Sequence, residues 1–187
     1  MQARNHVPFA MAWWWLYCLG TGQPIVMYAS MTAAFGGLLP DLDHPSSALG
    51  RRLPVISLPL SALVGHRGVT HSLFAVVVMF VGLLLTTALP AYAWGQGFIA
   101  PLLLGYLSHI TGDAMTPSGV PLFWPRRKTY SLNLFKTWSR TETIFVGVFT
   151  LGVAFFGGVV QNVLEDTMGQ MNRLPIGRLL LDAILPR

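Results

Sequence analysis

Long apolar stretches alternate with short polar ones along most of the chain. Three of them, residues 72–89, 98–110 with their flanks, and 143–163, meet the length of about 20 residues, with a range of about 17–25, that a membrane helix needs. Two shorter ones, residues 7–19 and 25–39, are joined by the turn sequence TGQP, and their length allows tilted, partly buried or re-entrant helices. The pattern predicts an all-α protein: a polytopic membrane helical bundle of about five transmembrane or partly re-entrant helices.

The composition supports this interpretation. Of the 187 residues, 53% are hydrophobic and 10% are charged, whereas a soluble domain carries about 25% charged residues. No linker or internal repeat divides the chain, so we expect a single membrane-embedded domain over residues 1–187. Its polar motifs lie within residues 1–130, and residues 131–187 hold the fifth helix and a variable tail. The single cysteine, Cys18, excludes both an intrachain disulfide and a cysteine zinc site.

Basic residues indicate how the bundle is oriented. If five segments cross in alternation, the N-terminus and the loops 40–71 and 117–142 lie on one side of the membrane, and the loops 20–24 and 90–97 lie on the other. The loops 20–24 and 90–97 contain no lysine or arginine. The side of the N-terminus carries Arg4, Arg51, Arg52, Arg67, Arg126, Arg127, Lys128, Lys136 and Arg140. Because basic loops stay in the cytoplasm, we place this side there. The net charge of +5 then favours membrane lipid as a partner and not nucleic acid.

Ionisable side chains collect at the same predicted face. All five histidines lie near helix ends there, and three aspartates join them. His109 and Asp113 stand four residues apart, on one face of one helix. Such a pair is expensive in lipid, so a functional role is the default. Structural alternatives exist for single motifs: Thr70 or Ser72 could cap a helix, but capping does not explain two histidines that flank an arginine in GHRGVTHS.

Imidazole and carboxylate groups together are suitable ligands for a divalent metal ion. Zinc is the ion we expect, and manganese or iron are alternatives. The candidate ligands for one or two ions are His6, Asp41, His44, His66, His71, His109 and Asp113. Two further residues are candidates for catalysis. Asp43 could be a ligand, a general base, or a partner that orients a histidine. Arg67 lies between two candidate ligands and suits an anionic oxygen, which favours a phosphoester substrate.

Four pieces of the sequence carry a family resemblance: His6, LLPDLDHPSSALGRR, GHRGVTHS and GYLSHITGDAMTPSGVPLFWP. In this order they resemble the YdjM-like family of bacterial inner-membrane proteins, described as membrane-bound metal-dependent hydrolases, over roughly residues 1–130. The resemblance implies a metal, a hydrolytic reaction and the bacterial inner (cytoplasmic) membrane. The H-x-x-x-D spacing is also similar, more distantly, to that of zinc-dependent phospholipase C.

The sequence thus predicts a membrane-bound metal-dependent hydrolase that acts through metal-activated water, with a lipid-linked phosphate or another phosphoester as substrate. Two alternatives remain at this stage. One is a noncatalytic membrane protein with a structural metal site. The other is a metal-ion or proton transporter, although transporters place ionisable groups near the bilayer midplane and not at one face. The oligomeric state is left open.

Overall fold

The computed structural model describes residues 1–65, 68–87 and 96–173. In this part of the chain the helices are α1 (Ala3–Thr21), α2 (Met27–Gly36), α3 (Pro54–Val64), α4 (Leu73–Thr87), α5 (Gln96–Ala114), α6 (Arg140–Phe156) and α7 (Val159–Arg173), with the short 3-10 helices η1 (Pro40–Asp43) and η2 (Val69–His71). Besides helices, the described residues form one isolated β-bridge, between Val120 and Tyr130, and no strand. The predicted all-α class is confirmed.

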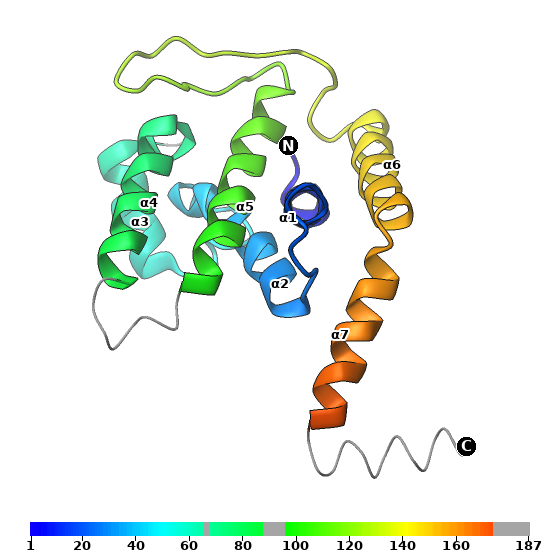
Figure 1. Cartoon of the computed structure of the whole chain (residues 1–187). Coiled ribbons are helices and arrows are strands. Elements are labelled where there is room, and N and C mark those ends of the chain that lie inside the picture. The colour runs from blue at the N-terminus through cyan, green and yellow to red at the C-terminus, as the bar shows by residue number, and fades with distance from the viewer. Residues whose placement is uncertain (66–67, 88–95, 174–187) are drawn as a thin grey trace.

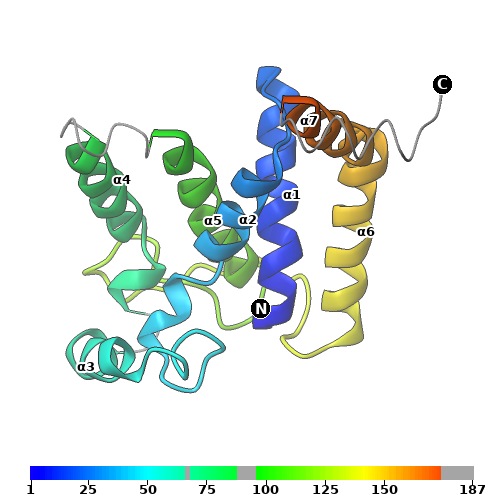
Figure 2. The same cartoon turned by 90° about the horizontal axis from the view of Figure 1, so that it is seen from below.

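Helix α1 is the central element of the bundle. It packs against α2 and α5 on one side and against α6 on the other, and α4 packs on α5 (Figures 1 and 2). The start of α1, the end of α5 and η1 lie at one end of the bundle, as Figure 2 shows. Residues far apart in the sequence therefore meet at that end.

Helices α2 and α5 approach each other backbone to backbone. A Cβ atom added to Gly105 would lie 2.9 Å from the Gly37 nitrogen and closer still to the Ala33 carbonyl oxygen. A Cβ atom on Gly36 would similarly collide with the carbonyl group of Leu102. Only glycine fits at these two crossing points, and the close contact fixes the position of α5 relative to the chain that follows α2.

A fully buried carboxylate ties α6 to the start of α1. The Glu142 side chain accepts hydrogen bonds from the Gln2 nitrogen (2.6 Å), the Asn5 side-chain amide (2.9 Å) and the Trp138 nitrogen (2.8 Å). The backbone nitrogen of Glu142 donates in turn to the Ser139 hydroxyl, which caps α6 (3.2 Å). Because three donors converge on one buried acceptor, the loop before α6 and the first turn of α1 are held in a fixed arrangement.

The helices depart from the expected apolar stretches at three places. The stretch 25–39 forms only the ten residues of α2, because the chain turns at Gly37 and continues into η1. The stretch 143–163 is broken between α6 and α7, where Gly158 adopts a positive φ of 59° that ends the helix. Helix α3, within the expected loop 40–71, was not predicted.

Taken singly, none of the described helices combines the length and the hydropathy of a membrane span. Helix α6 and the segment Val159–Gly169, bent by 61°, meet the criterion together. The described surface nevertheless carries many large apolar side chains, with Phe155 and Phe156 at the end of α6 exposed to 82% and 89%. The five membrane crossings and their orientation stay predictions.

Candidate metal centre

Five predicted ligands come together at the end of the bundle where α1 begins. They are His6 from α1, Asp41 from η1, His71 from η2, and His109 and Asp113 from α5. They form two overlapping groups, His6 with His109 and Asp113, and Asp41 with His71 and His109, and the ligand atoms within each group lie within 4.8 Å of one another. His109 belongs to both groups, so we treat the five side chains as one cluster.

The distances within the cluster suit a metal ion. The Nε2 atoms of His71 and His109 are 3.2 Å apart. Asp41 Oδ1 lies 3.8 Å from the first of these nitrogens and 3.7 Å from the second. Asp113 Oδ2 lies 3.8 Å and 3.9 Å from them, respectively. Ligand atoms bound at about 2.0–2.2 Å to one tetrahedral ion are roughly 3.3–3.6 Å apart, so the observed spacing is close to that of a coordination shell.

His6 provides an independent indication that a cation belongs here. Its side chain is fully buried, and neither ring nitrogen has a hydrogen-bond partner among the described residues. Its Nε2 atom is 3.5 Å from Asp113 Oδ1, and its ring stacks on that of His109 with 3.7 Å between centroids. The amino group of Met1 donates a hydrogen bond to the same Asp113 oxygen. A buried imidazole without a hydrogen bond is costly, and a bound cation would satisfy one of its nitrogens.

Outer contacts point the imidazole nitrogens inward. His109 Nδ1 lies 2.7 Å from the Gly37 carbonyl oxygen, so Nδ1 carries the proton and Nε2 presents its lone pair to the cluster. His71 Nδ1 lies 3.4 Å from Asp43 Oδ2 and 3.0 Å from the Thr70 hydroxyl oxygen. The Thr70 hydroxyl donates to the same Asp43 carboxylate. Outer partners of this kind are typical of histidines that bind metals.

The remaining candidates lie elsewhere. Asp43 is fully buried behind His71 and is in neither ligand group, a position that suits the orienting role among its three predicted alternatives. His44 follows η1 in extended backbone, and its ring contacts Ser46 and lies outside both groups. His66 and Arg67 are outside the described residues. Asp43 and Arg67 as catalytic residues, and His44 and His66 as ligands, stay predictions.

Two groups that support the cluster, the Gly37 carbonyl and Glu142, were not predicted from the sequence. The Gly37 carbonyl group left no side-chain signal. Glu142, by contrast, belongs to a Ser-x-x-Glu pattern with Ser139, which is the signature of a capped helix start and marks where α6 begins. The pattern could have located the helix, although not the reach of Glu142 across to α1.

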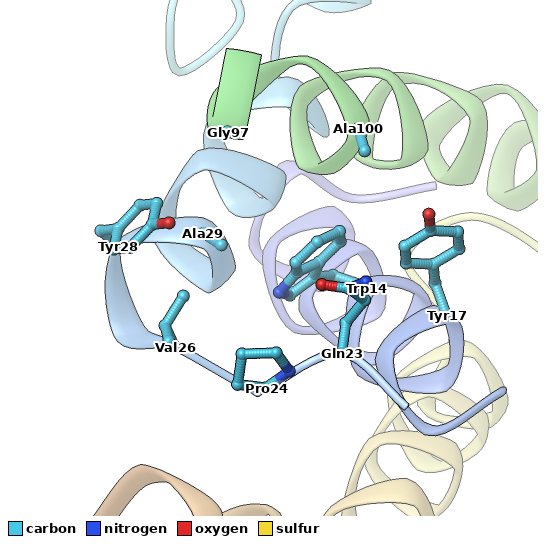
Figure 3. Close-up of a pocket in the computed structure, with 9 residues that line it drawn as sticks. All are labelled: Trp14, Tyr17, Gln23, Pro24, Val26, Tyr28, Ala29, Gly97 and Ala100. Atoms are coloured by element: carbon cyan, nitrogen blue, oxygen red, sulfur yellow. The ribbon is translucent and has the colours of Figure 1, made fainter. Parts of the chain in front are cut away.

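Two cavities differ in their relation to the cluster. One of about 290 Å³ lies near the end of α1 and the start of α5, where Trp14 faces Gln23 and Pro24, and its lining contains no histidine or carboxylate (Figure 3). The other, of about 550 Å³, lies at the cluster and is lined by Asp41 and His44. Asp41 is thus shared by the cluster and a cavity large enough for a small ligand.

The fold and the cluster define an all-helical protein with a candidate metal centre built from histidine and aspartate. The chain belongs to the YdjM family: residues 1–174 match the family described as YdjM inner membrane protein. It is 50% identical to the inner membrane protein YdjM of Escherichia coli over 99 residues, which make up 51% of this chain and 48% of the relative. The match to the Shigella flexneri protein of the same name has the same extent.

A more distant relative covers more of the chain. The uncharacterized protein YvsG of Bacillus subtilis is 34% identical over 135 residues, which make up 72% of this chain and 79% of that protein. The chain spans about half the length of the E. coli and Shigella relatives in these matches. No solved structure matches. The predicted family resemblance is confirmed, and it places the chain among inner membrane proteins of bacteria.

Proposed function

We propose that the protein is a metal-dependent hydrolase of the bacterial inner membrane that acts on a phosphoester, such as a lipid-linked phosphate. The observation that carries the proposal is the cluster of three imidazoles and two carboxylates, in which His6 is fully buried without a hydrogen-bond partner. Nitrogen and oxygen ligands without sulfur suit zinc, with manganese or iron as alternatives. Five ligands exceed the four of a tetrahedral site, so the cluster has room for one ion or two.

A divalent ion held there would lower the pKa of water towards ~7 and so supply a nucleophile at neutral pH. The residues around it have separate tasks. The Gly37 carbonyl oxygen accepts from His109 Nδ1, and the Thr70 hydroxyl and the Asp43 carboxylate lie beside His71 Nδ1. These outer contacts direct both Nε2 atoms into the cluster. Arg67, next to two candidate ligands in the sequence, is proposed to hold an anionic oxygen of the substrate.

The burial of the cluster indicates how substrate would reach it. The side chains of His6, His71 and His109 are fully buried and that of Asp113 is 2% exposed, whereas that of Asp41 is 17% exposed. Asp41 also lines the 550 Å³ cavity. Substrate would therefore approach past Asp41.

We place the cluster at the cytoplasmic face of a multi-pass protein. Two basic residues of the predicted cytoplasmic side, Arg4 and Arg51, lie at the same end of the bundle as the cluster, which supports this orientation. The exposed apolar side chains of α4 and α6, such as Val77 (57%) and Leu151 (71%), are suited to lipid.

Metal content and turnover test the proposal together. Purified protein should contain a transition metal and hydrolyse bis(p-nitrophenyl) phosphate, and His71→Ala and Asp113→Ala should lower both. His44→Ala is the matched control for metal content, because the ring lies outside both ligand groups. Retained metal without turnover on a panel of phosphomonoesters and phosphodiesters would refute the hydrolase.

That outcome would favour a structural metal centre instead. Nearly complete burial of four of the five ligands is the observation in favour of this second function, because structural sites are closed and catalytic sites keep one position open. The exposed fraction of Asp41 and its cavity favour the catalytic alternative.

A further inference from the structure

The 550 Å³ cavity beside the cluster is built from three distant parts of the chain. Gln2 and Arg4 come from the start of α1, Asp41, His44 and Arg51 from η1 and the loop after it, and Trp138 from the segment before α6. Figure 2 shows the first two of these elements at the same end of the bundle. A cavity of this size holds a small polar molecule or a lipid headgroup.

The charge of the lining favours an anion. The guanidinium groups of Arg4 and Arg51 have no ion pair or hydrogen bond with any described residue, so both are available to a ligand. Asp41 is the only carboxylate among the described lining residues, and it belongs to the metal-binding cluster. The start of α1, a 19-residue helix, adds the partial positive charge of its first backbone amides to this wall.

A buried amide points to a specific ligand as well. Gln2 is 3% exposed and lines the cavity, and neither its side-chain oxygen nor its side-chain nitrogen has a hydrogen-bond partner among the described residues. Leaving both atoms unpaired is costly, and a rotation of the side chain towards a polar ligand in the cavity would satisfy them. An amide donor beside two guanidinium groups forms a set of donors that matches the oxygens of a phosphate group.

The walls of the cavity are held in place by one side chain. The buried Glu142 carboxylate accepts from the backbone nitrogens of both Gln2 and Trp138, and thereby joins the α1 wall to the α6 wall. Trp138 adopts a left-handed backbone with φ of 68°, which side-chain-bearing residues rarely adopt, and its indole is 80% exposed at the rim. Backbone strain of this kind is typical of binding sites.

We propose that this cavity is a recognition pocket for a phosphate-bearing headgroup, in which Arg4 and Arg51 bind the phosphate oxygens and the Gln2 amide orients them. The pocket deepens the proposed hydrolase by giving the residues that would recognise its phosphoester substrate, and it rests on that function only for what happens after binding. The headgroup can come from a lipid or from a soluble phosphoester, because both present the same chemistry to the arginines.

Binding measurements test the pocket separately from turnover. The as-purified protein in detergent is titrated calorimetrically with glycerol 3-phosphate, and in a second arm it is floated with phosphatidylcholine vesicles that contain phosphatidic acid. Arg4→Ala and Arg51→Ala should weaken binding about tenfold or more, because each removes charge-assisted hydrogen bonds. Arg52→Ala is the matched control, since Arg52 neighbours Arg51 in the sequence but does not line the cavity. It should bind as the parent does.

The two arms identify the source of the headgroup. An effect of Arg4 and Arg51, but not of Arg52, in the vesicle arm alone supports a lipid headgroup, and the same effect in both arms supports a soluble phosphoester as well. Equal binding by all three variants, or no binding of either probe by the parent protein, overturns the pocket. Arginine-dependent binding without hydrolysis would uphold the pocket and refute the hydrolase, whereas hydrolysis with arginine-independent binding would do the reverse.

Discussion

Replacing Gly105 by alanine is expected to disrupt the fold and the metal centre together. A Cβ atom at this position would lie 2.9 Å from the Gly37 nitrogen and closer to the Ala33 carbonyl oxygen, whereas ordinary van der Waals contact begins at 3.4 Å. Both neighbours are backbone atoms, so no side chain can rotate away. Helices α2 and α5 must therefore separate.

The separation acts directly on the cluster, because the Gly37 carbonyl oxygen is the partner of His109 Nδ1 at 2.7 Å. A displacement of about 1 Å would stretch this contact beyond the length of a hydrogen bond. We expect Gly105→Ala to cost about 1–3 kcal/mol, as overpacking usually does. This corresponds to a decrease of about 2–4 °C in unfolding temperature for each kcal/mol in a chain of this size. Metal affinity should fall as well.

Thermal unfolding in detergent, followed by circular dichroism, measures the first effect, and a fluorescent zinc chelator in competition measures the second. Gly147→Ala is the matched control, because no atom lies within 4 Å of a Cβ atom there and α6 is continuous around it. It should be neutral or stabilising by up to ~1 kcal/mol, the usual helix preference for alanine. If Gly105→Ala behaves like Gly147→Ala in both assays, the close packing of α2 on α5 is wrong.

Three further predictions concern the supports of the site. Asp43→Asn should weaken metal binding about 10–100-fold in chelator competition, because the carboxylate orients His71 from behind, and unchanged affinity would contradict that role. Glu142→Ala should lower the unfolding temperature by at least about 4 °C, since it leaves three donors without their acceptor, and the two buried ones, from Gln2 and Asn5, cost about 1–3 kcal/mol each. The exposed Glu165→Ala is its control, and an equal effect of the two variants would argue against the buried tie. Removing metal with a chelator should lower the unfolding temperature of the parent and of His44→Ala, but not of His71→Ala; a shift of the same size in His71→Ala would show that the metal is bound elsewhere.

Local sequence periodicity was sufficient to predict the pair on α5. His109 and Asp113, four residues apart in an apolar stretch, share a helix face, and in the structure both face the cluster, with Nε2 and Oδ2 3.9 Å apart. The remaining ligands were predicted to lie at the same end of the bundle, because every candidate lies near the end of a predicted helix. The pair on α5 depends on the helical repeat alone, whereas the meeting of the other ligands depends on where the helices end.

The separate roles of neighbouring residues, as a metal ligand or as the partner of a ligand, could not be predicted from the helical repeat. Asp41, Asp43 and His44 lie within four residues, and the sequence offered Asp41 and His44 as ligands while leaving Asp43 as a ligand, a base or an orienting partner. The tight turn of η1 directs Asp41 to the cluster and Asp43 behind His71, while the extended backbone of His44 leads its ring towards Ser46. Contacts such as that of Glu142 with Gln2 join residues 140 positions apart, and no local pattern encodes them.

The fifth apolar stretch shows a further limit of pattern reasoning. Its hydropathy continues across Gly157 and Gly158, so the sequence predicts one helix, but a residue with positive φ ends α6 there. Helix α3 was missed for the opposite reason, because a helix of 11 residues is too short to stand out as a span. Length criteria for membrane helices detect neither breaks nor short helices.

Anomalous diffraction at the zinc absorption edge, from crystals of the purified protein, tests the central claim most directly. We predict a peak within about 2.0–2.2 Å of the Nε2 atoms of His71 and His109, with aspartate oxygens completing its shell. An ordered cluster without a peak, or a peak bound by none of the five side chains of the cluster, would contradict the account.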